Sequence, residues 1–336
     1  MLKGDKLQVI IPTAGLGSRL RPHTHTHAKP LVHVAGNSVL GYILDDLKKL
    51  NVSEIIFIIG YLGDQIKDYV TKNYDFKARF IEQKELKGQA HAIQLAKPFI
   101  KEDVLIWFAD TMSNADTGKI KKTKSDGLIY VKKTSEPERF GIVFPDKDGI
   151  IKNIIEKPDY PTSNLANIGI YYVKNYKLLF ESIEHLIKHD MQTKGEFYLV
   201  DALNIMIKRG EKFKIESVDV WEDCGKPETL LLTNKYLLSK MKPKKYKNIK
   251  TSVIINPVYI EPGAKVEHSI IGPHVSIAKG ANIKNSHIQN SIIGEDSVIE
   301  DFQMKDSIVG FKAHVKGSYK QINIGDDSEL KDDNSS

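Results

Sequence analysis

The segment AGLGSRLRPHTHTHAKP, close to the N-terminus, contains the residue types best suited to chemistry. Its glycines, Gly15 and Gly17, let backbone N–H groups approach a phosphate closely, and Arg19 and Lys29 supply positive charge. A dinucleotide-binding G-x-G-x-x-G sequence is excluded because Leu20 stands at the third glycine position, and the string that defines a Walker loop does not occur. We therefore interpret the segment as a loop that holds the phosphates of a nucleoside triphosphate.

Three histidines occupy alternate positions in the same segment, His23, His25 and His27. On an extended strand this spacing would place all three side chains on one face, where they could bind zinc. The neighbouring phosphate-binding residues favour a second interpretation, in which the histidines are surface or packing residues. A position of one of them near the triphosphate is a further alternative, so their role stays open.

Two aspartates stand at positions suited to holding Mg²⁺. Asp110 ends the apolar run VLIWFAD, and Asp223 lies in VWEDCGKPETL, where an apolar run leads into a Gly-Lys-Pro turn. Reactions of a nucleoside triphosphate depend on positioning and on charge neutralisation, which Mg²⁺ held by one or two carboxylates can supply. The two aspartates are far apart in the sequence, so only the fold can bring them together. An aspartate at a strand end is often only a helix cap, and this alternative stays open for each.

The elements around these residues predict an α/β fold. Apolar runs such as LQVIIP, EIIFIIG and DVLIWFAD alternate with helical patterns, which is typical of a mostly parallel sheet with helices on both faces. Such a sheet binds ligands beyond the carboxyl ends of its strands, so the glycine loop and Asp110 should lie at one edge. Later runs predict hairpin-like strands, KIESVDVWEDCG predicts one further strand, and helices are expected over 39–50, 89–100 and 227–241.

Beyond Val253 the apolar residues recur every 16–17 positions in three interleaved series, which indicates a three-sided coil. No turn of such a coil can bury its apolar edge alone, so the turns must stack. The series are Ile260, Ile277, Ile293 and Val309; Val266, Ile283, Ile299 and Val315; and Ile271, Ile288 and Met304. The expected architecture is a Rossmann-like mixed sheet over 1–240, a basic linker over 241–252, a short left-handed parallel β-helix of hexapeptide repeats over 253–328, and an acidic tail over 329–336.

Composition narrows the class of protein further. The chain has 336 residues, a net charge of +6 and one cysteine, so no intrachain disulfide can form and a reducing, cytoplasmic compartment is expected. Its apolar runs are too short for a signal peptide or a membrane helix. The lysine-rich linker is interpreted as solvated rather than as a nucleic-acid contact, because no aromatic platform accompanies it. The β-helix makes a homo-oligomer the expected assembly.

The glycine loop closely resembles the opening signature of the sugar-1-phosphate nucleotidylyltransferases. That signature is G-x-G-x-R-L-x-P-x-T followed by K-P-L, and this chain matches it from Gly15 to Thr24 and again at Lys29. Trp221-Glu-Asp-Cys-Gly-Lys-Pro227 matches W-x-D-x-G-x-P, and Glu156-Lys-Pro matches E-K-P. The resemblance covers about residues 7–235 and is closest to glucose-1-phosphate thymidylyl- and uridylyltransferases with a C-terminal left-handed β-helix.

The resemblance implies a role for each matching residue. It assigns Arg19 and Lys29 to the triphosphate, and Lys157 to the phosphate of the attacking sugar. The Mg²⁺ ligands that it implies are Asp110 and Asp223. The implied nucleotide-binding residues are Ala14, Gly15, Gly17, Ser18, Gln83 and Gly88, and the implied sugar-binding residues are Gly141, Glu156 and Asn167. Many relatives have threonine or a small residue where this chain has Gln89, which is expected to alter base or ribose contacts.

The implied function is Mg²⁺-dependent transfer of a nucleotidyl group from dTTP or UTP to a sugar 1-phosphate, with glucose 1-phosphate the expected acceptor. An NDP-sugar and pyrophosphate are the products. One alternative is a bifunctional enzyme whose β-helix also carries an acyltransferase, with His268, His274 and His287 as candidate bases. Another is a non-catalytic subunit that senses sugar nucleotides. The presence of both aspartates assigned to the metal site argues against this alternative.

Overall fold

The computed structural model describes residues 6–160, 162–246 and 248–317. The chain divides into two compact units, residues 1–237 and 238–336. Each unit contains its own cluster of buried apolar side chains. No helix in the described ranges has the length and apolar character needed to span a bilayer.

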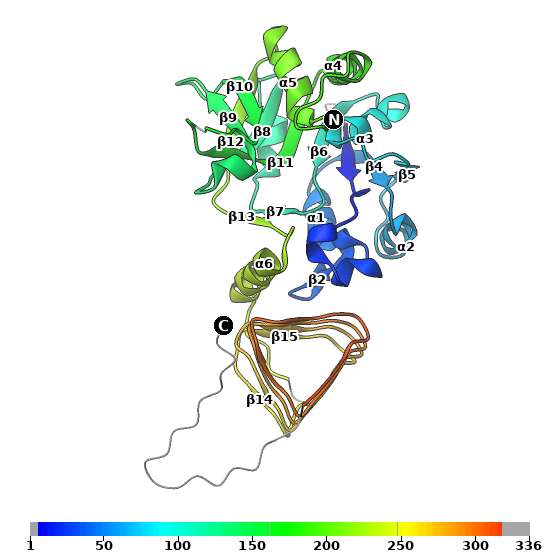
Figure 1. Cartoon of the computed structure of the whole chain (residues 1–336), viewed down its shortest axis with the longest axis vertical. Coiled ribbons are helices and arrows are strands. Elements are labelled where there is room, and N and C mark those ends of the chain that lie inside the picture. The colour runs from blue at the N-terminus through cyan, green and yellow to red at the C-terminus, as the bar shows by residue number, and fades with distance from the viewer. Residues whose placement is uncertain (1–5, 161, 247, 318–336) are drawn as a thin grey trace, which may run out of the picture. The chain divides into compact units, whose positions relative to one another are not determined.

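The first unit is built on a mixed sheet that has nine strands among the described residues. Its path is β10-β9-β11-β6-β1-β4-β5, with β8 and β12 branching from β11 (Figure 1). The strands around the glycine loop are parallel, whereas β11 runs antiparallel to β6 and β8, which confirms the predicted mixed sheet. Its strands are β1 (Leu7–Pro12), β4 (Val52–Ile59), β5 (Ala78–Glu82), β6 (Asp103–Trp107), β8 (Gly127–Lys133), β9 (Gly141–Pro145), β10 (Ile151–Glu156), β11 (Leu165–Val173) and β12 (Phe213–Ser217).

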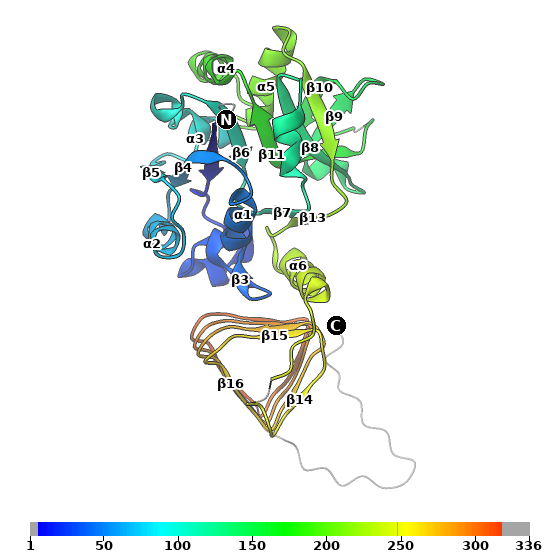
Figure 2. The same ribbon diagram turned by 180° about the vertical axis from the view of Figure 1, so that it is seen from behind.

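Helices bury both faces of the central strands, which explains their continuous apolar runs. Side chains from α3, α4 and α5 join one core with Ile10 of β1, Ile56 of β4 and Ile106 of β6. Figure 2 shows the opposite side of the unit, where α1 approaches the short strand β7. The helices are α1 (Val39–Leu47), α2 (Gly63–Asn73), α3 (Gln89–Gln94), α4 (Tyr176–Lys188), α5 (Leu199–Lys208) and α6 (Pro227–Lys240).

Two sequence predictions of elements are wrong. The helix expected over 89–100 ends at Gln94, and a separate 3-10 turn follows over Lys97–Phe99, where Pro98 has no N–H to continue an α-helix. The single strand expected in KIESVDVWEDCG is two strands, β12 and β13 (Trp221–Asp223), in different sheets. The chain leaves the main sheet between them, and the side chain of Asn114 accepts hydrogen bonds from the N–H groups of Asp219 and Val220.

Two small two-stranded sheets complete the first unit. β2 (His33–Val34) pairs with β3 (Asn37–Ser38) just before α1, and the Ser38 hydroxyl caps that helix by accepting from the Gly41 N–H at 2.9 Å. β7 (Thr111–Ser113) pairs antiparallel with β13. This second pairing joins the segment after β6 to a segment more than a hundred residues later.

The second unit is a coil of stacked turns with a triangular outline, and it confirms the expected left-handed parallel β-helix (Figure 1). Within the described range each side is a four-stranded parallel sheet. The first side contains β14 (Val253–Ile254), β17 (Ile270–Ile271), β20 (His287–Gln289) and β23 (Gln303–Lys305). The second contains β15 (Val258–Ile260), β18 (Val275–Ile277), β21 (Ile292–Ile293) and β24 (Ile308–Val309). The third contains β16 (Lys265–Glu267), β19 (Asn282–Lys284), β22 (Val298–Glu300) and β25 (His314–Lys316).

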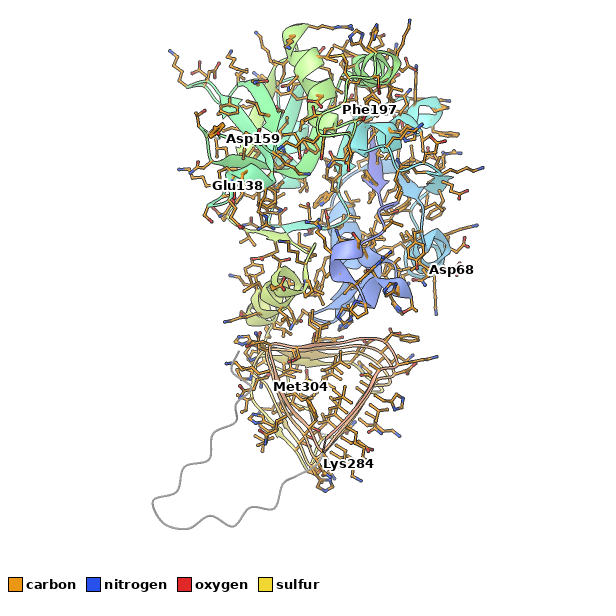
Figure 3. The ribbon with its side chains drawn as sticks, in the orientation of Figure 1. Asp68, Glu138, Asp159, Phe197, Lys284 and Met304 are labelled. Carbon is orange, nitrogen blue, oxygen red and sulfur yellow. The ribbon has the colours of Figure 1, made fainter. Side chains whose placement is uncertain are left out.

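The interior of the coil is formed by the three predicted apolar series. Met304 packs against the buried core while Lys284 is exposed on the outside, and Figure 3 labels both. Several corner residues have the positive φ that glycine, asparagine and aspartate tolerate best, among them Gly280, Asn285 and Asp301. Residues 318–328 of the expected coil and the expected acidic tail lie outside the described residues.

The segment expected to be a linker contributes to the coil. Tyr246 and Ile249 pack against the apolar core of the coil. The Tyr246 hydroxyl donates to the Val258 carbonyl at 2.9 Å and accepts from the Ile260 N–H at 3.0 Å, so it satisfies two backbone groups of β15. Because lysines surround these two residues in the sequence, their packing against the coil was not predicted.

Candidate active site

The glycine loop follows β1 and is held by contacts among its own residues. Gly17 has a φ of +64°, and a Cβ there would lie 2.9 Å from Cβ of Lys29, so only glycine fits without displacing that lysine. The buried Thr24 hydroxyl donates to the Gly17 carbonyl at 2.8 Å. Gly15, in contrast, is exposed and has open space around it. The loop therefore fixes Lys29 and leaves Gly15 accessible.

The histidine segment is not an extended strand, so the arrangement required for a zinc-binding face is absent here. His23 and His25 belong to a 3-10 turn over His23–His25. Among the described residues, no cluster of three or more histidine, cysteine or carboxylate side chains is arranged to hold a metal ion. Burial lowers the pKa of His23.

Lys29 and Asp110 form an ion pair, with Nζ and Oδ2 2.6 Å apart. The Lys29 side chain is 16% exposed and that of Asp110 31% exposed, so the pair is partly shielded from water. Burial alone would raise the pKa of Asp110. The charge and hydrogen bond of Lys29, together with the charge of Arg19, outweigh that effect and lower it. Asp110 is therefore ionised and faces the two cations assigned to the triphosphate.

The pairing of β7 with β13 brings the backbones of the two predicted metal-binding aspartates together. Asp223 lies opposite Thr111, and the Cys224 N–H donates to the Asp110 carbonyl at 2.9 Å. Asp110 occupies the turn between β6 and β7, three residues beyond the last residue of β6, rather than the strand end itself. Only the backbone of Asp223 is described. Two aspartates whose backbones lie side by side suit Mg²⁺, because proteins hold this ion through one or two carboxylates. Phosphate oxygens and water complete its coordination shell.

A cavity of about 460 Å³ opens beside this pair and is large enough for a sugar phosphate. It brings together residues from five distant parts of the chain: the glycine loop, the start of α3, the β6–β7 turn, the β9–β11 region and β13. The predicted site residues in its wall are Arg19, Asp110, Gly141, Glu156, Lys157 and Asn167. These residues, predicted to contact the triphosphate, the metal or the sugar, all lie in the wall of one cavity.

The polar end of this cavity is closely packed around Gly141. A Cβ at Gly141 would come within 2.1 Å of Nδ2 of Asn167 and 2.8 Å of Oε2 of Glu156. Asn167 Nδ2 donates to the Gly141 carbonyl at 2.8 Å, and the Tyr171 hydroxyl donates to Asn167 Oδ1. Asn167 is thereby fixed by its neighbours, and Gly141 provides the space that brings Asn167 and Glu156 together.

Lys157 follows β10 directly and has a φ of +44°, which is uncommon for a residue other than glycine. Its N–H donates to the Phe140 carbonyl at 3.0 Å, and its carbonyl accepts from Lys194 Nζ at 2.7 Å. Its own Nζ donates to the Tyr198 hydroxyl at 2.9 Å. The left-handed backbone is therefore held from both sides while the ammonium group reaches the cavity.

Burial raises the pKa of Glu156 to about 7, an effect that the charge of Lys157 only partly offsets. The unfolded chain would have the ordinary value of 4.5, so the folded protein binds this proton more tightly. The stabilisation that comes from this tighter proton binding at Glu156 is present below pH 4.5, the pKa in the unfolded chain. It is lost as the pH rises from 4.5 to about 7.

Replacing Glu156 with glutamine (E156Q) should therefore stabilise the first unit more at about pH 8 than at about pH 5, by at most roughly 3 kcal/mol. Thermal unfolding of the variant and the wild type at both pH values measures the difference. E138Q, which alters an exposed glutamate, is the control. An E156Q effect of equal size at both pH values would contradict the assignment of a raised pKa.

The predicted nucleotide-base residues lie outside the large cavity, at the carboxyl end of β5. Gln83 is buried, and its N–H donates to the Ile59 carbonyl at the end of β4. Gly88 has a φ of +100°, and a Cβ there would lie 2.7 Å from the Phe197 backbone. A smaller cavity of about 180 Å³ lies beside the glycine loop, with Gly15, Lys29 and Asp110 in its wall.

Gln89, expected from the sequence to alter base or ribose contacts, lines both cavities. Two further residues in and around the site, Trp221 and Tyr198, were not predicted as site residues. Trp221 and Phe140 meet edge to face in the wall of the large cavity, with ring centroids 4.7 Å apart. Tyr198 reaches Lys157 from the start of α5. Trp221 was quoted within its motif, but nothing in the sequence indicated the contacts of Tyr198, which depend on packing between distant segments.

Comparison with known proteins shows the family to which the chain belongs. The nucleotidyl transferase family model matches residues 8–240. This chain belongs to the nucleotidyl transferase family. The bifunctional protein GlmU of Methanocaldococcus jannaschii is 36% identical over 77% of this chain and 61% of its own length, so the chain spans less than two thirds of that relative. The low-salt glycan biosynthesis nucleotidyltransferase Agl11 of Haloferax volcanii is 29% identical over 96% of this chain and 99% of its own length.

The solved structures similar to this chain agree with its fold. A Bacillus anthracis chain has a TM-score of 0.60 at 24% identity and covers 71% of this chain and 98% of its own. A UDP-glucose pyrophosphorylase from Acinetobacter baumanii has a TM-score of 0.58 at 18% identity and covers 70% of this chain and 94% of its own. The predicted resemblance to sugar-1-phosphate nucleotidylyltransferases is confirmed at the level of the family.

Proposed function

We propose that this protein transfers a nucleotidyl group from UTP or dTTP to glucose 1-phosphate and releases pyrophosphate. The observation that carries the proposal is the single cavity that Arg19, Asp110, Glu156 and Lys157 share. A cavity lined by cations together with a half-buried glutamate and a buried asparagine suits a substrate that carries both a phosphate and hydroxyl groups. A Streptomyces griseus glucose-1-phosphate thymidylyltransferase, 27% identical over 93% of this chain, gives the proposed substrates their support.

In the proposed reaction a phosphate oxygen of the sugar 1-phosphate attacks the α-phosphorus of the nucleoside triphosphate. The new P–O bond forms as the bond from the α-phosphorus to the bridging oxygen breaks, and that oxygen leaves with its electron pair as part of pyrophosphate. Lys157 neutralises the attacking phosphate, while Lys29 and Arg19 hold the departing phosphates. Mg²⁺ held by Asp110 and Asp223 would supply further neutralisation of the phosphate charge. Glu156 and Asn167 orient the sugar hydroxyls.

A pyrophosphate-release assay tests the proposal directly. UTP, dTTP, CTP, ATP and GTP are each combined with glucose 1-phosphate, and with a panel of other sugar 1-phosphates, in the presence of Mg²⁺. Release with UTP or dTTP and glucose 1-phosphate is the expected result. Release only with another sugar would correct the acceptor, and no release with any pair would remove the catalytic interpretation.

A further inference from the structure

A histidine on α3 contacts the side chain of the residue assigned to the nucleotide base. Nε2 of Gln83 and Nδ1 of His91 lie 3.1 Å apart. Gln83 is 6% exposed, so its amide has little access to water as an alternative partner. The backbone N–H of Gln83 is already bonded to the Ile59 carbonyl. Both the position and the rotation of this amide are therefore set by the protein.

The chemistry of the contact fixes which atom donates. An amide nitrogen only donates hydrogen bonds, so Nδ1 of His91 must be the acceptor and the ring must be neutral. Burial, followed by the charge of Lys87, lowers the pKa of His91, which is consistent with a neutral ring. With one N–H engaged by His91, the Gln83 amide is held in one orientation, in which its carbonyl oxygen and its second N–H keep fixed positions.

The location of Gln83 fits a nucleotide whose phosphates occupy the glycine loop. β5 pairs with β4, and β4 pairs with β1, so the ends of these three strands are neighbours at one sheet edge. Gly60, just beyond β4, lies so close to the glycine loop that a Cβ there would be 2.8 Å from the Ala14 carbonyl oxygen. Gln83, at the end of β5, thus lies two strands along the sheet from β1, the strand that precedes the phosphate-binding loop.

We propose that His91 is a specificity-determining residue that locks the Gln83 amide with its carbonyl oxygen toward the base, so that the site selects uracil or thymine over cytosine. The inference rests on the proposed function for the identity of the ligand. Uracil and thymine present an N3–H donor beside a carbonyl, whereas cytosine presents an N3 acceptor at the same position. A carbonyl oxygen held by the protein accepts from the first edge and leaves two acceptors facing each other with the second.

Binding of UTP and CTP, measured by titration calorimetry without sugar 1-phosphate, tests the inference independently of turnover. The wild type should bind UTP at least about 30-fold more tightly than CTP, since mispaired buried polar groups cost that order of affinity. His91→Phe removes the acceptor and frees the amide to rotate, so the UTP-to-CTP ratio should fall to about threefold or less. His91→Asn keeps an acceptor oxygen near the position of Nδ1 and should preserve most of the ratio.

His189→Phe, a change at an exposed histidine just after α4, is the matched control and should leave the ratio unchanged. Melting temperatures of all variants show whether each is folded. A His91→Phe variant that keeps the wild-type ratio, or a wild type that binds CTP as tightly as UTP, would overturn the inference. Pyrophosphate release, measured separately, reports on the proposed function, so failure of either proposal is recognised without the other.

Discussion

Replacement of Asp110 by asparagine (D110N) is expected to lower kcat for pyrophosphate release by about 10³-fold, since metal-assisted neutralisation of phosphate charge supplies several kcal/mol. Asparagine has the same shape, so the turn between β6 and β7 should keep its backbone contacts with β13. What changes is the charge: Lys29 loses its partner at 2.6 Å, and one of the two carboxylates assigned to Mg²⁺ disappears. Steady-state kinetics at saturating substrate concentrations measures the loss.

D148N, which alters an exposed aspartate in the turn between β9 and β10, is the matched control and should retain full activity. D223N should resemble D110N, and the double variant should be little slower than either single variant, because both residues are assigned to one metal ion. A D110N enzyme within about threefold of the wild-type kcat would remove Asp110 from the proposed metal site.

Replacement of Lys157 by methionine (K157M) is expected to lower kcat/KM for the sugar 1-phosphate by about 10²- to 10³-fold, while KM for the nucleoside triphosphate changes by less than about threefold. Methionine matches the unbranched apolar part of the lysine side chain and meets the same restriction at a φ of +44°, so the backbone should be unaffected. The variant loses the ammonium group that the proposal assigns to the attacking phosphate and that donates to Tyr198.

K147M is the control for this variant, because Lys147 is an exposed lysine in the turn that precedes β10. If K157M instead raised KM for the nucleoside triphosphate and left the sugar 1-phosphate parameters unchanged, Lys157 would belong to the triphosphate end of the site. The two kinetic parameters therefore distinguish the proposed assignment from the opposite one.

Most strands of the mixed sheet and the coil could be predicted from the sequence, because they depend on local periodicity. Motif spacing also singled out charged residues that the fold places on one cavity, and their roles there stay predictions. It did not reveal that Lys29 and Asp110 bond to each other, since the motifs assign them to different parts of the substrate. It also did not show the break between β12 and β13, which depends on Asn114 holding the backbone of Asp219 and Val220. The raised pKa of Glu156 arises from burial, which no motif encodes.

The core of the coil could be predicted from the sequence only where its residues repeat. Its inward apolar series were visible as a repeat, because each turn uses the same interval. Tyr246 and Ile249 also belong to its core, but they precede the repeat and stand among lysines, so composition alone indicated a solvated linker. A side chain that packs once, without repetition, leaves no periodic signal.

The strand pairings of the two units predict different folding kinetics. In the coil Val258 pairs with Val275 and Ile292 with Ile308, so each added strand closes a short loop onto an edge that already exists. In the first unit Leu7 pairs with Asp103, and Phe213 with Gly127, so long loops must close before the central strands gain their partners. Because folding slows as contacts join more distant residues, the coil should grow turn by turn while assembly of the mixed sheet limits how quickly the whole chain becomes native.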